Sequence, residues 1–318
     1  MRGMVLCAGL GTRLRPLTEF WPKPALPLLG APLLRSHLVS LHAAGIREVG
    51  INTHHLGETM RRVAEAETAR LGMSLTVVHE DVLQGTGGGI RSLREFLSGS
   101  DPFVVLNGDI AFEPPLPAII EAHHASGADG TMVLQPLPEG ERYGAVEADA
   151  SGRIRRIAGV GPGGEGLASW HFTGVHVMRP RVFDFMTDAV PEELFRDVYA
   201  RLFEAGGHIQ GVTAEGDWAD LGTPTRYLSM VLEVVSGARR APSGAALTDF
   251  DRRPDAWVHR AARVDPSAML EGGVVVEAEA QVGANARLSR CVLLPGARVE
   301  PGARLENKLV GPDFCIDA

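Results

Sequence analysis

The sequence predicts an α/β protein with a doubly wound, mainly parallel mixed sheet, followed by a short parallel β-helix made of hexapeptide repeats. Up to residue 136, short apolar runs alternate with segments of helical periodicity, which is typical of such a sheet. The runs are nearly continuous, as expected of strands buried on both faces. After residue 256, apolar residues recur every six positions, which indicates coils stacked on one another.

In the first region the expected strands span 3–9, 47–54, 74–80, 102–109 and 130–136, and the expected helices span 32–45, 56–72, 89–97 and 116–127. These helices usually end at a glycine, a common C-terminal signal. As the second half of the same domain we expect strands at 143–149, 153–159 and 171–180 and helices at 181–186 and 192–206. Ligands of doubly wound sheets bind beyond the carboxyl ends of the strands.

The C-terminal repeat rests on eight apolar residues: Val264, Leu270, Val276, Val282 and Leu288, then, one residue out of phase, Leu293, Val299 and Leu305. Small residues and Gly-Ala or Pro-Gly pairs fill the intervals. Residues 237–256 are rich in Arg, Pro, Gly and Ala without periodicity, which is typical of a linker. The sequence therefore predicts an α/β domain over 1–236, a linker over 237–256 and a β-helix tail over 257–318.

Composition and charge exclude several classes of protein. With 45% hydrophobic and 22% charged residues, the chain resembles an ordinary globular protein, and no apolar run approaches the roughly 20 residues of a membrane span. The net charge of −8 argues against a nucleic-acid binder, which needs a broad basic face. Cys7, Cys291 and Cys315 form neither a disulfide framework nor a metal-binding spacing, and a cytoplasmic location is expected.

The segment 7–30, CAGLGTRLRPLTEFWPKPALPLLG, begins like a phosphate-binding glycine loop. Gly9 and Gly11 follow the first predicted strand, where missing side chains let backbone N–H groups approach a phosphate. The third glycine and the acidic residue of a dinucleotide site are absent. Instead Arg13 lies at the loop tip, and Lys23 lies between two prolines that are expected to hold its segment extended. These two cations suit a polyphosphate.

The same residues resemble a known family. AGLGTRLRPLTEFWPKP is similar to the G-x-G-T-R-x-x-P…P-K-P signature of the sugar-1-phosphate nucleotidyltransferases, and the resemblance covers residues 3–235. VVLNGDI (104–110) and GDWADLGTPTRY (216–227) resemble two further segments of that family, in which hexapeptide extensions are familiar. The resemblance implies a Rossmann-like nucleotidyltransferase fold. It also implies an enzyme that joins a nucleoside triphosphate to a sugar-1-phosphate, forming an NDP-sugar and releasing pyrophosphate.

The resemblance further implies roles for individual residues. Arg13 would hold the leaving phosphates and Lys23 a phosphate near the reacting centre, while Asp109 and Asp220 would bind Mg²⁺, which favours carboxylate and phosphate oxygens. The implied nucleotide-binding residues are Ala8, Gly9, Gly11, Thr12, Glu80, Gln84, Gly85, Thr86 and Asn107, and the implied sugar-binding residues are Tyr143, Gly144, Thr173 and Gly174. Catalysis would be mostly positioning and charge neutralisation, since the attacking phosphate oxygen is already ionised.

The substrate pair stays open at this stage. The run HEDVLQGTGGGI (79–90) resembles the family's base-reading loop and favours guanylyl or uridylyl transfer over thymidylyl transfer. Many members carry a Glu-Lys-Pro whose lysine binds the sugar phosphate, but here Gly159 and Val160 stand roughly in that place. The implied reaction is therefore guanylyl transfer to mannose-1-phosphate or uridylyl transfer to an amino-sugar-1-phosphate.

Two other interpretations compete with this one. A regulatory homologue would bind nucleotide sugars without turnover; the missing lysine favours it, whereas the four implied catalytic and metal-binding residues favour an enzyme. A hexapeptide acyltransferase would need more coils and a histidine between subunits, and the tail offers only His259 near its start. We expect instead that the tail mediates contacts in a homo-oligomer.

Overall fold

The computed structural model describes residues 1–137 and 145–318, and its contacts divide the chain into two units. Unit 1 consists of Met1–Gly9 and His37–Trp218, and unit 2 consists of Leu10–Ser36 and Ala219–Ala318. By its contacts, the segment that carries Arg13 therefore belongs with the C-terminal part of the chain, although it lies near the N-terminus in sequence. The predicted domain limits at 236 and 257 stay predictions.

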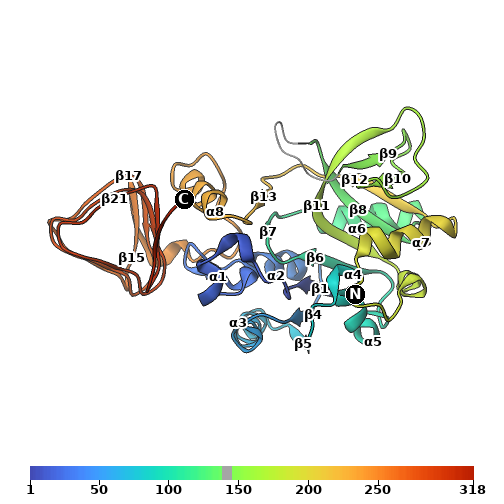
Figure 1. Cartoon of the computed structure of the whole chain (residues 1–318), viewed down its shortest axis with the longest axis horizontal. Helices are drawn as coiled ribbons and strands as arrows, with labels where there is room; N and C mark the ends of the chain where they lie inside the picture. Colours follow the sequence, from blue (N-terminus) through green and yellow to red (C-terminus); the bar gives the residue numbers. More distant parts are fainter. Residues whose placement is uncertain (138–144) are drawn as a thin grey trace. The chain divides into compact units, whose positions relative to one another are not determined.

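Unit 1 is built on a nine-stranded mixed sheet (Figure 1). Its strands are β1 (Arg2–Leu6), β4 (Glu48–Thr53), β5 (Ser74–His79), β6 (Phe103–Asn107), β8 (Gly130–Gln135), β9 (Val146–Ala148), β10 (Ile154–Ile157), β11 (Ala168–Met178) and β12 (Ile209–Thr213). The order β5-β4-β1-β6 is parallel throughout. The long strand β11 runs antiparallel to both β6 and β8, and β12 pairs with β8 in parallel. The predicted doubly wound, mainly parallel mixed sheet is confirmed.

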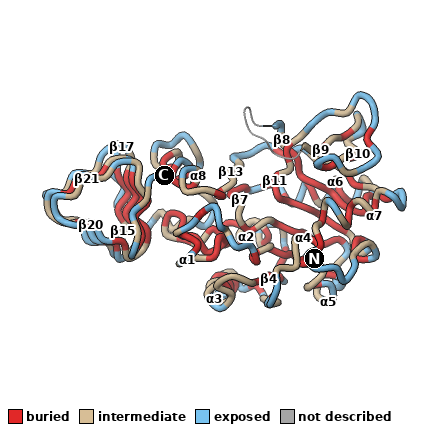
Figure 2. Tube along the Cα trace, in the orientation of Figure 1, coloured by how far each residue is buried: buried red, intermediate tan, exposed pale blue. Residues whose placement is uncertain are grey.

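Helices cover both faces of this sheet, and buried residues line its strands (Figure 2). They are α2 (Leu34–Ala43), α3 (Gly57–Arg70), α4 (Gly85–Ser92), α5 (Arg94–Leu97), α6 (Leu116–Ser126) and α7 (Tyr199–Glu204). On one face, Met4 shares a core cluster with Tyr199 of α7. On the other face, Leu41 of α2 lies 3.0 Å from the position that a Cβ of Gly3 would occupy. Since successive residues of a strand point to opposite faces, the sheet is the middle of three layers.

The helix predicted over 89–97 is wrong at its start. The structure has α4 from Gly85 and a separate α5, and the break lies at Leu93. The first turn of α4 contains several glycines, which are poor helix formers. Its free N–H groups nevertheless find partners: Gln84 donates to Oε2 of Glu80 at 3.0 Å, and Gly88 donates to the carbonyl of Glu192 at 3.1 Å. The contact with Glu192 joins segments far apart in the sequence, so it leaves no local signal there.

The remaining elements of unit 1 are short. They are β7 (Ile110–Ala111), the 3-10 segment η3 (Pro180–Phe185) and the π-helical turn η4 (Leu194–Val198), which leads into α7. No helix in the described parts of the chain is both long and apolar enough to cross a membrane.

Unit 2 begins with the segment around Lys23. Its elements before the tail are η1 (Thr12–Leu14), α1 (Leu17–Phe20), η2 (Lys23–Ala25), β2 (Pro27–Leu28), β3 (Ala31–Pro32), β13 (Ala219–Asp220), α8 (Pro224–Val235) and η5 (Leu247–Asp249). The expectation of an extended segment at Lys23 is wrong, because Lys23 opens the single 3-10 turn η2. Pro24 is tolerated there since the first turn of a helix does not use its N–H groups.

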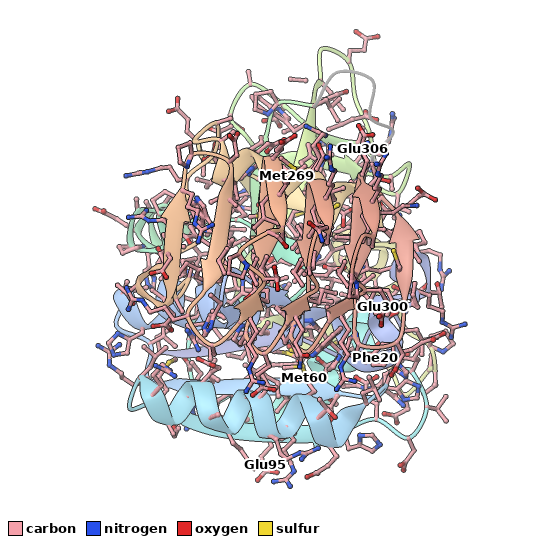
Figure 3. The ribbon with its side chains drawn as sticks, turned by 90° about the vertical axis from the view of Figure 1, so that its left-hand side faces the viewer. Phe20, Met60, Glu95, Met269, Glu300 and Glu306 are labelled. Carbon is pink, nitrogen blue, oxygen red and sulfur yellow. The ribbon has the colours of Figure 1, made fainter. Side chains whose placement is uncertain are left out.

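The tail is a parallel β-helix, as predicted, and Figure 3 shows its strands side by side. Its strands are β14 (Phe250–Arg253), β15 (Ala256–His259), β16 (Arg263–Val264), β17 (Met269–Val276), β18 (Gln281–Val282), β19 (Arg287–Leu293), β20 (Arg298–Val299), β21 (Arg304–Glu306), β22 (Lys308–Val310) and β23 (Cys315–Asp317). The stacks β15-β17-β19-β22 and β16-β18-β20 are parallel. Part of the predicted linker is strand β14, which pairs antiparallel with β15.

The phase change in the hexapeptide pattern marks a shorter coil. Val264 pairs with Val282, eighteen residues later, whereas Val282 pairs with Val299, only seventeen residues later. The difference arises at one corner, where Gly272–Gly273 of the first coil face the single residue Arg290 of the second. All three corner residues have positive φ. The second coil is thus one residue shorter at this corner, and the apolar residues before and after the corner still pair in register.

Candidate functional site

In unit 1, one chain of buried hydrogen bonds joins the end of β1 to the start of α4. The N–H of Cys7 donates to Oδ1 of Asn52 at 2.9 Å, and Nδ2 of Asn52 donates to Oε1 of Glu80 at 2.7 Å. The other carboxylate oxygen of Glu80 accepts the N–H of Gln84 at 3.0 Å. Asn52 and Glu80 are both buried. We call this connection the Asn52–Glu80 bridge; it ties the glycine loop to the predicted base-reading loop.

The Asn52–Glu80 bridge accounts for the position of Glu80 and Gln84 in the predicted base-reading loop, and it adds Asn52 to the residues that hold this loop. Asn52 was missed by sequence reasoning, although a polar amide at the end of the apolar run over 47–54 was its signal. A Cβ on Gly89 would lie 2.6 Å from Nδ2 of Asn52, so the bridge requires a glycine there. The side chain of Gln84 donates to the carbonyl of Val82 at 2.9 Å. The predicted roles of Glu80 and Gln84 in reading the base stay predictions.

Gly85 and Thr86, the other predicted nucleotide contacts of this loop, open α4 against the segment that contains Glu192. Gly85 has φ 75, and a Cβ there would lie 2.6 Å from the carbonyl oxygen of Glu192. Glu192 is itself buried, and its carboxylate forms ion pairs with Arg91, at 3.3 Å, and with Arg201. Sequence reasoning missed Glu192. Its carboxylate pairs with Arg91 of α4 and its carbonyl accepts the N–H of Gly88, so Glu192 also holds the loop in place.

At the end of β6, a predicted nucleotide contact and a predicted sugar contact lie side by side. Gly174 has φ 89, and a Cβ there would lie 3.0 Å from Cβ of Asn107. The pairing of β11 with β8 changes register at this point, so the glycine permits a bulge. Thr173 is buried and its hydroxyl donates to the carbonyl of Val133 at 2.9 Å. Two other predicted sugar contacts, Tyr143 and Gly144, lie outside the described residues.

Asp109 follows β6 and is only half-buried. Burial lowers the pKa of the neighbouring His37 to about 4, although the backbone carbonyl of Gly108 and the charge of Asp109 oppose this shift. Burial, and to a smaller extent the charge of Asp109, raises the pKa of the Cys7 thiol. Both groups are therefore neutral at physiological pH, and neither cancels the negative charge of Asp109.

The backbone at Gly9 faces open space. Ala8 is buried, whereas Gly9 is exposed, and nothing lies within 4 Å of the position that a Cβ of Gly9 would occupy. Its φ also lies outside the left-handed region. Neither packing nor backbone conformation thus requires a glycine at this position. A ligand that comes close to the backbone would supply the reason.

In unit 2, the signature loop is folded tightly around Gly11. Gly11 has φ 62, and its carbonyl accepts the hydroxyl of Thr18 at 2.9 Å. A Cβ on Gly11 would lie 2.6 Å from Cγ2 of Thr18 and 3.0 Å from Cγ of Lys23. Thr12 and Arg13 are exposed on η1, whereas only 8% of Lys23 is exposed. The loop therefore presents one cation at the surface and holds the stem of the other against its own backbone.

The structure brings the predicted residues Arg13 and Asp220 together. A Cβ on Gly222 would lie 2.7 Å from Oδ1 of Asp220 and 3.2 Å from Nη2 of Arg13. The other oxygen of Asp220 accepts a hydrogen bond of 2.6 Å from Arg226 at the start of α8. Sequence reasoning missed Arg226, which lies within the quoted segment 216–227. Because Asp109 belongs to unit 1 and Asp220 to unit 2, their meeting at one metal ion stays a prediction.

Comparison with known proteins identifies the family. The family described as nucleotidyl transferase matches residues 2–236. A mannose-1-phosphate guanylyltransferase of Mycobacterium tuberculosis is 33% identical over 308 residues, which cover 96% of this chain and 82% of the relative. Two similar proteins are a probable mannose-1-phosphate guanylyltransferase 3 of Oryza sativa subsp. japonica, 26% identical, and a mannose-1-phosphate guanylyltransferase catalytic subunit beta of Xenopus tropicalis, 28% identical; each match covers 98% of this chain and 86% of the relative. The chain belongs to the nucleotidyl transferase family.

Proposed function

We propose that the protein transfers a guanylyl group from GTP to mannose-1-phosphate and releases pyrophosphate. One observation carries the choice of substrates: relatives from a bacterium, a plant and a vertebrate, each aligned over nearly the whole chain, are all named for this reaction. The family match over 2–236 supports the more general step, the transfer of a nucleotidyl group.

The proposed chemistry needs no proton transfer by the protein. A phosphate oxygen of mannose-1-phosphate attacks the α-phosphorus of GTP, and the bond from that phosphorus to the bridging oxygen breaks. Pyrophosphate leaves with the electron pair. Arg13 would hold the departing β- and γ-phosphates, for which its exposed guanidinium is suited. Lys23 would hold a phosphate at the reacting centre, so the two cations act by positioning and by neutralising charge.

Magnesium is part of the proposal. Mg²⁺ usually binds one or two protein carboxylates and completes its coordination with water and substrate phosphates. The residues fit this pattern, because Asp109 is only half-buried after β6 and one oxygen of Asp220 remains beside the one that accepts from Arg226. Asp109 and Asp220 would supply the carboxylates, and Arg226 would fix the orientation of Asp220. When bound, the ion would neutralise charge on the phosphates.

We also propose that the tail forms a homo-oligomer through one face, built by the first parts of β17 and β19 and by β21. Met269, Arg287 and Arg304 are in register in one row, and Glu271, Ser289 and Glu306 form the next outward-facing row. A hollow of about 260 Å³ lies between them, and Met269 is 45% exposed. Met269 and Glu306 are labelled in Figure 3. A two-fold axis along the stack of coils would set each Arg304 opposite the Glu306 of a second copy.

The proposed reaction predicts a specific outcome in a pyrophosphate-release screen. GTP with mannose-1-phosphate should give the highest kcat/KM when GTP, UTP, dTTP and ATP are crossed with four sugar phosphates, those of mannose, glucose, N-acetylglucosamine and N-acetylmuramate. UTP with an amino-sugar-1-phosphate as the best pair would overturn the choice of substrates. Release from no pair, with binding of a nucleotide sugar retained in calorimetry, would instead support the regulatory homologue.

Substitution of Asp109 tests the proposed metal site. Asp109→Asn should lower kcat at least roughly 100-fold, because one charged oxygen ligand is lost at a site where charge is stabilised. The melting temperature should stay close to that of the wild type, since Asp109 is half-buried at a strand end. The matched control is Asp184→Asn, which changes an exposed carboxylate on η3 and should leave kcat unchanged. Near-normal turnover of Asp109→Asn shows that the metal site is misplaced.

The two glycines of the loop should respond differently to alanine. Gly9→Ala places a methyl group in open space and should weaken GTP binding roughly tenfold, or about 1.4 kcal/mol, without a change in melting temperature. Gly11→Ala should lower the melting temperature, because its φ of 62 and the nearby Thr18 and Lys23 disfavour a side chain. Isothermal titration calorimetry and thermal unfolding measure the two effects. Unchanged GTP affinity in Gly9→Ala contradicts a phosphate contact there.

Charge exchange tests the proposed oligomer face. Arg304→Glu alone should shift the protein toward the monomer in light scattering, because it opposes Glu306 of the second copy. The double variant Arg304→Glu/Glu306→Arg restores the opposite charges and should recover the oligomer. A wild type that is monomeric at low salt, or an oligomer that Arg304→Glu leaves intact, excludes this face.

A further inference from the structure

We propose that the C-terminal part of unit 2, and in particular Glu277 and Phe314 of the β-helix tail, positions the lysine arm of the signature loop. By lysine arm we mean residues 17–32, with Lys23 near the middle. The inference rests on the proposed function, in which Lys23 binds a phosphate at the reacting centre. It assigns Glu277 and Phe314 as positioning residues rather than catalytic ones.

Beyond Lys23, the arm forms the hairpin β2–β3, whose turn is held by a buried carboxylate of the tail. The turn residues Leu29 and Gly30 both have positive φ, 54 and 78. The N–H of Gly30 donates to both carboxylate oxygens of Glu277, at 3.2 and 3.1 Å, and the N–H of Leu29 also hydrogen-bonds to this carboxylate. Glu277 directly follows β17 and is 1% exposed. A residue of the β-helix thus binds a turn almost 250 positions earlier in the sequence.

Residues of α8, of the segment that follows it and of β14 also contact the same hairpin. The carbonyl of Leu29 accepts the N–H of Ala246 at 3.0 Å. A Cβ on Gly30 would lie 3.0 Å from the Cβ of Ala246 and 3.0 Å from the ring of Phe250. The buried hydroxyl of Tyr227 on α8 donates to the carbonyl of Pro27. The hairpin is therefore held by backbone groups, which fixes its position whatever its own side chains are.

Before Lys23, the arm meets the end of the tail through aromatic rings. Phe20, the last residue of α1, has its ring centroid 5.5 Å from that of Phe314, which lies between β22 and β23. The ring of Trp21 lies 5.7 Å from Phe20. Phe20 is labelled in Figure 3. Lys23 therefore lies between two anchors on the tail, with Phe20 three residues before it and the Leu29–Gly30 turn six residues after it.

Glu277 is almost fully buried although it carries a carboxyl group. Burial raises the pKa of Glu277 to about 7, although the N–H groups of Gly30 and Leu29 act in the opposite direction. Burial of a carboxyl group costs free energy, which the two N–H groups offset in part. An apolar side chain would avoid this cost but would leave both N–H groups of the turn without this acceptor. A buried polar group that fixes the register of two segments is a use for which such a cost is known. Here the two segments are the tail and the arm of Lys23.

The composition of the chain makes the proposal testable without substrate. Lys23 and Lys308 are the only lysines, against 29 arginines. Lys308 lies on β22, where its side chain is 25% exposed. An amine-acylating reagent followed by peptide mass spectrometry therefore reads the accessibility of Lys23, with Lys308 as the internal reference. In the wild type, Lys23 should react slowly because it is 8% exposed.

In Glu277→Gln the amide can accept one N–H of the turn but turns its own donors toward the other. The acylation rate of Lys23 should rise several-fold, while that of Lys308 stays the same. Phe314→Ala removes the contact with Phe20 and should also raise the acylation rate of Lys23. Glu300→Gln removes an exposed carboxylate of the tail and should change neither rate. An unchanged rate at Lys23 in both Glu277→Gln and Phe314→Ala overturns the proposal.

A destabilised tail must be separated from a displaced arm. Leu288→Ala removes buried side-chain volume from the core of the β-helix without touching the arm, and should lower the melting temperature at least as much as Glu277→Gln. If Leu288→Ala raises the acylation rate of Lys23 equally, the effect is general loosening and the proposal fails. If Glu277→Gln does not fold, Phe314→Ala carries the same comparison.

The kinetic readout links the arm to turnover. Misplacement by about 1 Å can cost up to roughly 100-fold in rate, so Glu277→Gln should lower kcat roughly tenfold with a much smaller change in KM. Leu288→Ala, assayed below its melting temperature, should keep its kcat. Raised acylation of Lys23 with normal kcat overturns the positioning role. A wild type without turnover would instead count against the proposed function, while the acylation result still decides whether the tail holds the arm.

Discussion

The parallel pairing of β1 with both β4 and β6 is the constraint on which unit 1 depends. It brings the carboxyl ends of three strands to one edge of the sheet, where the chain must leave each strand and expose backbone polar groups. Buried groups of this kind need partners. The Asn52–Glu80 bridge supplies them, and it does so with side chains that come from the exits of β4 and β5. The predicted base-reading loop is held by this network, and the end of β6 brings Asp109 to the same edge.

The sequence predicted the strands and most helices because their information is local. Apolar runs and helical periodicity can be recognised from a short stretch of sequence alone. The hexapeptide pattern can be recognised even across the shortened coil. The early start of α4 was not predictable, since its glycine-rich first turn is supported by the carbonyl of Glu192, which lies far from it in sequence. The 3-10 turn at Lys23 was missed because two prolines allow both an extended chain and the first turn of a helix.

The residues of the candidate site also fall into two groups, those that the sequence predicts and those that it does not. Motif residues such as Arg13 and Asp109 could be named from the sequence because their types and spacing carry chemistry. The residues that support the site could not, because nothing local distinguishes Arg226, which pairs with Asp220, or Glu192, which contacts α4, from the many other charged residues. The glycine loop shows both cases within a few residues. A glycine is required at position 11 by its positive φ and by its close neighbours. At position 9, neither the backbone conformation nor the packing of the protein requires a glycine.

The strands at the two ends of the β-helix limit what the tail can become. β14 and β23 both run antiparallel to the coils that they cover, and β14 carries the exposed charges of Asp251, Arg252 and Arg253. On the face built by β15, β17, β19 and β22, an added coil would need a parallel edge, and the two antiparallel strands leave none. This face is therefore closed to end-to-end stacking of a second β-helix. Phe314 directly precedes β23, so the strand that caps this end of the face also fixes the residue that contacts Phe20.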